Sequence, residues 1–96
     1  MSDSVVHFRI EPLGDHEYLV AISSGTQTAE PQVRASPGIM RELGAGEDAE
    51  QRVVHETTAF LLDHQPLFDL PPMIDLEDVA AAYDDYLDEL RQRLSR

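Results

Sequence analysis

The chain has 96 residues; its seven basic side chains are all arginines, and 19 acidic residues bring the formal charge to −12. A chain of this length makes one domain, so we expect a single α+β domain over residues 1–96, with residues 1–4 as a disordered tail. The charge excludes binding to nucleic acid phosphates or to an anionic membrane, because both need a basic patch.

The lack of cysteine and of long apolar runs narrows the class of protein further. Without cysteine there is neither a disulfide nor thiolate chemistry. No run approaches the ~18 apolar residues of a membrane-spanning helix, and residues 1–4 lack the basic start of a signal peptide. We therefore expect a soluble cytoplasmic protein.

The excess of acidic residues has two interpretations. It is either a halophilic-type surface, shared by the proteins of a salt-adapted cell, or a surface that meets a basic partner or imitates DNA. The acidic residues are spread along the whole chain rather than gathered in one block. That spread favours the first interpretation.

Residues 5–10 and 17–23 alternate apolar and polar side chains, which predicts an antiparallel hairpin with one buried face. That face comprises Val6, Phe8 and Ile10 in the first strand and Tyr18, Val20 and Ile22 in the second. Residues 26–35 predict a weaker third strand. Pro31 cannot donate to a ladder, so this strand should lie at a sheet edge.

Two helices should follow. Ser36 as N-cap and Pro37 at the first helical position predict a short helix that ends at Gly44. Residues 48–65 predict a second helix, which Pro66 ends. Its apolar face gathers Val53, Val54, Thr57, Phe60 and Leu61.

A third helix is predicted from its cap at Asp75, with Asp78 as a weak capping-box partner, to about Leu94. Its apolar side chains fall within an arc of roughly 120°, the width of a core-facing or partner-facing stripe. The order of three strands and three helices predicts an α+β fold. In it a small three-stranded antiparallel sheet is packed on one face by helices, with a long amphipathic helix at the C-terminus.

The four histidines do not form a motif. His55 and Glu56 begin a pattern like the zinc-protease helix, but Ala59 stands where the second histidine is needed. His64 suits a structural role, hydrogen bonding to free carbonyls at its helix end. We therefore expect no catalytic site, metal or cofactor. An enzyme would need His7, His16 or His55 to converge with an acidic residue between the sheet and the second helix.

The third helix carries both candidate surfaces. Its acidic face, Asp84, Asp85, Asp88 and Glu89, is the candidate surface for a basic partner. Its apolar stripe is longer than a small sheet covers, so a partner should meet it. The candidate interface residues are Tyr83, Tyr86, Leu87, Leu90 and Leu94.

The middle of the chain, from residue 17 to residue 70, resembles small uncharacterised prokaryotic proteins of hairpin-plus-helix type. The segments that carry the resemblance are residues 17–22, 33–36, 58–66 and 68–70. The resemblance covers just over half the chain. It departs at His64 and Gln65, where those proteins usually carry Glu and Arg, and at the long third helix. It implies a compact hairpin-plus-helix domain and no activity.

The leading hypothesis is a non-enzymatic, acidic module for protein–protein interaction that associates with itself as a homodimer or with another protein. One alternative is an antitoxin-like or DNA-mimicking regulator that binds a basic partner. Another alternative is a small enzyme with a His/Asp site. None of the three involves direct contact with nucleic acid or with a membrane.

Overall fold

The N-terminal hairpin forms as its alternation predicts. In the computed structural model, which describes residues 6–95, β1 (Val6–Gly14) pairs antiparallel with β2 (Glu17–Ser24). Val20 and Ile22 are buried, as expected for the inner face. Val6 remains 41% exposed, so the start of β1 contributes little to the core. The tail expected over residues 1–4 lies outside the described residues.

The third predicted strand divides into β3 (Gln27–Ala29) and β4 (Gln32–Arg34), which both pair antiparallel with β2. Pro31 lies between them, and its carbonyl accepts a hydrogen bond from the Val20 amide at 3.0 Å. The expectation that this strand lies at a sheet edge is wrong for β4. Pro31 falls between the two ladders rather than within one, so β4 can pair on both sides.

On its far side, β4 pairs with a strand that the sequence did not reveal, β5 (Met73–Asp75). This pairing is parallel, so the sheet is mixed, in the order β1-β2-β4-β5 with β3 beside β2. The prediction of three antiparallel strands is therefore wrong. A parallel partner requires a long crossover, which the helices between β4 and β5 supply.

The first of these helices, α1 (Pro37–Leu43), has the predicted start and end. Pro37 opens it, and Gly44 closes it in the left-handed conformation with φ 69°. Ser36 stands at the N-cap position, but its side chain makes no capping hydrogen bond. Its hydroxyl is buried and finds no partner within residues 6–95, so the predicted capping role of this side chain is wrong.

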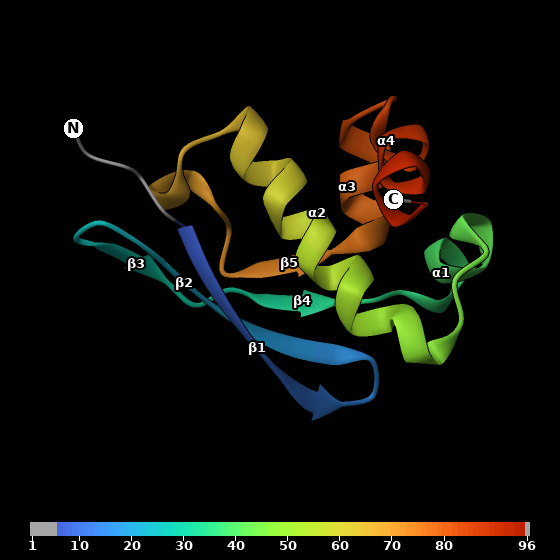
Figure 1. The fold of residues 1–96 in the computed structure, drawn as a ribbon, viewed down its shortest axis with the longest axis horizontal. Coiled ribbons are helices and arrows are strands. Elements are labelled where there is room, and N and C mark those ends of the chain that lie inside the picture. The colour runs from blue at the N-terminus through green and yellow to red at the C-terminus, as the bar shows by residue number, and fades with distance from the viewer. Residues whose placement is uncertain (1–5, 96) are drawn as a thin grey trace.

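The second helix, α2 (Glu50–His64), follows a 3₁₀ turn, η1 (Glu47–Ala49). Its predicted apolar face is confirmed: Val53, Val54, Thr57, Phe60 and Leu61 are all buried. A further 3₁₀ turn, η2 (Leu67–Asp69), leads to β5. Figure 1 shows α2 running across the strands, with the remaining helices gathered on the same side of the sheet.

The long third helix is interrupted. It divides into α3 (Leu76–Ala82) and α4 (Tyr86–Leu94), with Tyr83 in an extended conformation between them. Tyr83, Asp84 and Asp85 are weak helix formers, and aspartate competes for backbone hydrogen bonds at caps and turns. The cap predicted at Asp75 is confirmed, because its carboxylate accepts a hydrogen bond from the Glu77 amide at 2.9 Å.

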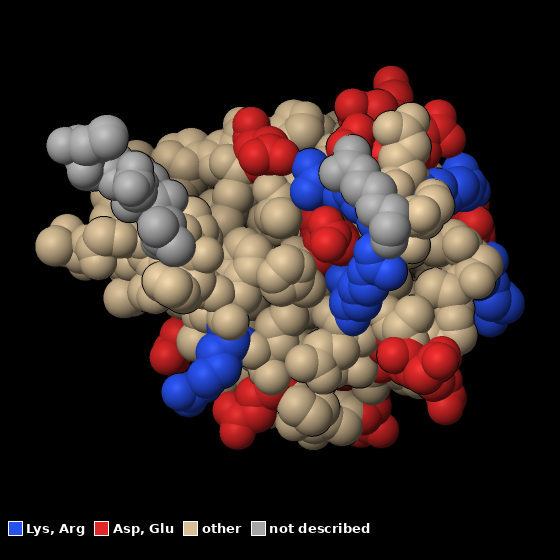
Figure 2. Space-filling view, in the orientation of Figure 1, with Lys and Arg blue, Asp and Glu red and all other residues tan. Residues whose placement is uncertain are grey.

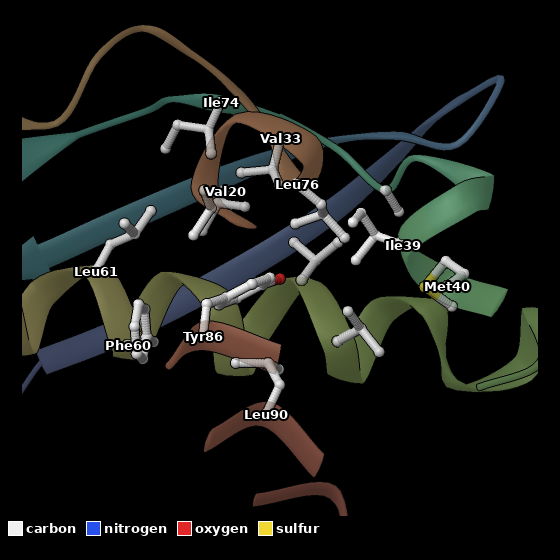
Figure 3. Packing of buried hydrophobic residues seen from close by; sticks show 14 of the residues in the cluster. Val20, Val33, Ile39, Met40, Phe60, Leu61, Ile74, Leu76, Tyr86 and Leu90 are labelled. Carbon is white, nitrogen blue, oxygen red and sulfur yellow. The ribbon is translucent and has the colours of Figure 1, made fainter. Parts of the chain in front are cut away.

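The break lets the two helices face different neighbours, α3 toward β5 and α4 toward α2. The core therefore includes side chains from the sheet and from every α-helix. Figure 3 shows Tyr86 beside α2 among these side chains. The Tyr86 hydroxyl lies 2.7 Å from the Thr57 hydroxyl, which satisfies both polar groups in an apolar setting.

Candidate functional site

The four acidic residues predicted to bind a basic partner do not share one helix face. Asp84 and Asp85 lie in the turn between α3 and α4, whereas Asp88 and Glu89 lie within α4. Each of the two in α4 pairs with an arginine of the same helix at 3.1 Å. Because the helix break separates these pairs, a continuous acidic stripe does not form. The role of these residues toward a basic partner stays a prediction.

Arg93 ties α4 to α2 through three carboxylates. Its guanidinium nitrogens lie 2.8 Å from Asp63, 3.1 Å from Glu89 and 3.6 Å from Glu56. Burial alone would lower the pKa of Arg93, but hydrogen bonds to Asp63 and Glu89 raise it above its ordinary value. Figure 2 shows basic and acidic side chains interspersed over the end of the molecule that holds α4. Because one guanidinium is shared by three carboxylates of α2 and α4, this cluster has a structural role.

The candidate interface loses two of its five members to the core. Tyr86 and Leu90 are both 0% exposed within the chain itself, so neither can meet a partner in this conformation. Tyr83, Leu87 and Leu94 are half-buried and pack against the core from outside. The expectation that Leu90 contacts a partner is therefore wrong, because α4 turns this side chain inward.

The four histidines lie apart. His7 is exposed on β1, and the only carboxylate from residues 6–95 near His55 is that of its neighbour Glu56, at 3.8 Å. The structural role predicted for His64 is confirmed, because its Nδ1 donates to the carbonyl of Phe60 at 2.9 Å. Within residues 6–95 no group of three His, Asp or Glu side chains is arranged to hold a metal ion.

The fourth histidine, His16, does converge with an acidic residue. Its Nδ1 lies 2.7 Å from one carboxylate oxygen of Glu50, and the Tyr18 hydroxyl donates to the other oxygen at 2.6 Å. Glu50 is only 7% exposed, in the first turn of α2, where a helix favours negative charge. Burial and the hydrogen bond to Glu50 raise the pKa of Tyr18 to about 12.

The backbone of His16 is strained to reach this position. Asp15 and His16 form the turn between β1 and β2 with φ values of 53° and 65°. Such a hairpin turn prefers asparagine and glycine, and a left-handed histidine costs roughly 1–2 kcal/mol. Strain of this kind is typical of residues whose side chain is needed at a fixed place.

Sequence reasoning considered His16 but missed Glu50 and Tyr18. A signal for Glu50 was present, because it falls on the helical spacing of the apolar face that continues at Val53, Val54 and Thr57. A carboxylate at a core position needs a partner. Its partners lie 32 and 34 residues away, in the hairpin, where no local pattern identifies them.

An apolar concave surface lies beside β5. We call this open hollow of about 400 Å³ the β5 hollow. Its walls come from the end of α2, the segment around β5, and α3. The residues that line it are Leu61, Gln65, Pro71, Met73, Ile74, Asp75, Asp78, Val79, Ala82 and Tyr83. They include two carboxylates and no cationic side chain, and Met73 is 63% exposed.

No protein-family model, curated protein or solved structure matches this chain. Within residues 6–95 no helix has the length and apolar character needed to cross a bilayer. What the protein does must therefore be inferred from the geometry of its own residues.

Proposed function

We propose that this chain is an acidic protein-interaction module whose β5 hollow binds a basic, amphipathic helical segment of another protein. The observation that carries the proposal is the composition of the hollow: an apolar surface lined by two carboxylates, Asp75, which lies 3.9 Å from Arg34, and Asp78, which forms no ion pair within residues 6–95. Apolar grooves between helices are a common setting for amphipathic helices.

The exposure of Met73 supports a docking role. A methionine that is 63% exposed places a large flexible apolar side chain in water, while the next residue, Ile74, is 5% exposed. Methionine adapts its shape to apolar partners and recurs at surfaces that bind helices. Tyr83, a member of the candidate interface, lines the same hollow, and tyrosine is enriched at protein interfaces.

Charge indicates a basic partner rather than a second copy of the chain. Asp75 and Asp78 line the hollow, and the whole chain carries −12. A homodimer formed through this hollow would bring like charges together, whereas lysine or arginine on a partner would pair with them. The same charge would also speed the encounter with a basic partner, most strongly at low salt.

Calorimetric titration with synthetic peptides tests the proposal. The probe is a helical peptide with leucines on one face and lysines on the other. Two analogues serve as controls: one carries glutamate in place of every lysine, and one has the same composition with the leucines scattered. We expect saturable one-to-one binding of the first peptide only. Equal binding of the scattered peptide would mean that net charge alone attracts it, which contradicts the hollow as the site.

Matched variants locate the binding surface. We expect Met73→Glu and Asp78→Arg each to weaken peptide binding about tenfold, the effect of losing about 1.4 kcal/mol. The control is Asp84→Arg, which makes the same charge change outside the hollow and should alter affinity less than twofold. If Asp84→Arg abolishes binding while Asp78→Arg does not, the acidic residues of the α3–α4 turn are the binding surface instead.

Sedimentation of the free protein addresses the self-association that the sequence suggested. We expect a monomer at low salt, because repulsion between acidic chains is then least screened. A stable dimer that Met73→Glu dissociates would show that the second copy, rather than a basic segment, occupies the β5 hollow.

A further inference from the structure

A second hollow lies beside the hairpin turn and shares no residue with the β5 hollow. It measures about 310 Å³, at the lower end of the range of about 300–1,000 Å³ typical of small-molecule sites. We call it the His16 hollow. Pro37, Met40 and Ala45 give it an apolar part. His16, Arg41, Glu47 and Glu50 give it a charged part.

Glu50 determines which hydrogen bond the His16 ring can still make. A carboxylate only accepts hydrogen bonds, so in the neutral ring the proton is on Nδ1, which lies 2.7 Å from Glu50. Tyr18 occupies the other oxygen of Glu50 and prevents the carboxylate from turning away. In this neutral form Nε2, which makes no hydrogen bond within residues 6–95, is a free acceptor.

Two charged side chains of the His16 hollow form no ion pair with the part of the chain that the structure describes. Arg41, in the last turn of α1, forms no ion pair with any residue from 6 to 95, although the chain holds 19 acidic residues. Glu47 likewise has no cation in that range, and its charge contributes to raising the pKa of Tyr18. One anion-binding group and two acceptors for ligand donors therefore line one small hollow.

We propose that the His16 hollow binds a small zwitterion, an α-amino acid. Its carboxylate pairs with the guanidinium of Arg41, a geometry that arginine favours. Its ammonium donates to His16 Nε2 and to the carboxylate of Glu47. Pro37, Met40 and Ala45 then contact a small aliphatic side chain. An α-hydroxy acid shares the carboxylate and a donor, but one hydroxyl cannot serve both acceptors.

The strained backbone of His16 supports a role for the ring beyond tying the hairpin to α2. Glycine at this position would relieve the left-handed strain. Asparagine also tolerates this conformation, and its amide can still donate to Glu50. The free acceptor of the imidazole, Nε2, lies farther from the backbone than the Oδ1 of asparagine, so asparagine cannot place an acceptor at the same point of the hollow.

An NMR titration of the ¹⁵N-labelled protein tests the proposal with alanine, lactate and acetate as probes. We expect alanine to shift the amide resonances of Ala45 and Gly46, with an affinity at least tenfold above that of lactate or acetate. Equal binding of the three compounds would reduce the hollow to a carboxylate site. Shifts outside the hollow only, or none, would overturn the proposal outright.

Variants separate binding from folding. Arg41→Gln and Glu47→Gln should each weaken alanine binding at least fivefold, whereas Arg9→Gln and Glu77→Gln, the same changes outside the hollow, should not.

His16→Asn should keep the fold, judged by an unchanged pattern of amide resonances, and weaken alanine binding about tenfold. A folded His16→Asn protein that binds alanine like the original would contradict the role of Nε2. Asp78→Arg, which alters only the β5 hollow, should leave alanine binding intact.

Discussion

α3 and α4 are successive short helices that both carry leucine and acidic side chains, yet they contribute differently to the molecule. α4 packs on α2 and buries Tyr86 and Leu90 completely. α3 packs beside β5, and the chain leaves it at Tyr83, which lines the open β5 hollow. Three residues of non-helical backbone thus separate α4, which fills the core against α2, from α3, which borders the β5 hollow.

The largest effect should come from removing a core side chain of α4. Leu90→Ala should lower the free energy of unfolding by about 4 kcal/mol, because it deletes a buried side chain and leaves a cavity. The matched variant is Leu87→Ala, one turn earlier and half-buried, which should cost about 1 kcal/mol. Urea denaturation measures both values. Similar losses would mean that α4 does not pack through Leu90.

Alkaline pH should produce the next largest effect, through the buried phenol of α4. Burial raises the pKa of Tyr86 to about 12. The folded state therefore holds this proton more tightly than the unfolded state, whose tyrosines ionise near 10. The stabilisation is complete below pH 10 and is lost as pH rises from 10 to 12, at about 3 kcal/mol for a shift of two units.

The composition makes this test clean, because the chain has neither lysine nor cysteine to titrate in the same range. The free energy of unfolding at pH 9 and at pH 11.5 should differ in the original protein, with Tyr18 adding to the loss through its own pKa of about 12. Tyr86→Phe should retain only the part that comes from Tyr18. An unchanged pH dependence in Tyr86→Phe would show that Tyr86 is accessible to solvent.

Local periodicity explains which elements the sequence predicted. The alternation in β1 and β2 and the helical spacing in α2 are long enough to be read without tertiary information. β5 is three residues long and follows two prolines, so no periodic signal exists, and only its pairing with β4 makes it a strand. The break after α3 did have a signal in the sequence, because Asp84 and Asp85 are weak helix formers. The apolar arc continues past them, however, and it predicted a single unbroken helix.

The site was less predictable than the fold for a related reason. Glu50 belongs to the apolar spacing of α2, so its burial could be inferred from the sequence, but its contacts with Tyr18 and His16 depend on how the hairpin meets α2. The β5 hollow depends equally on β5 and on the turn at Tyr83. Both hollows form where elements distant in sequence pack together, beside turns and a short strand that carry no periodic pattern.

The smallest of the three effects should come from the polar face of α4. Arg93 is 16% exposed and contacts Asp63, Glu89 and Glu56, so it holds α4 on α2 by charge as well as by packing. Arg93→Gln removes the one cation that contacts all three carboxylates among the described residues. We expect a loss of about 1–2 kcal/mol in the free energy of unfolding at low salt, because networks around a partly buried guanidinium exceed the value of single exposed pairs.

Salt and a matched variant distinguish this network from ordinary surface pairing. In 1 M NaCl, where the screening length is about 3 Å, the carboxylates left by Arg93→Gln repel one another less, so the difference from the original protein should shrink. Arg91→Gln removes a guanidinium whose carboxylate partner, Asp88, is 81% exposed, and it should cost less than about 0.5 kcal/mol at either salt concentration. A larger loss for Arg91→Gln than for Arg93→Gln would mean that the contacts of Arg91 with Asp88 and with the Glu42 carbonyl, rather than the network around Arg93, anchor α4.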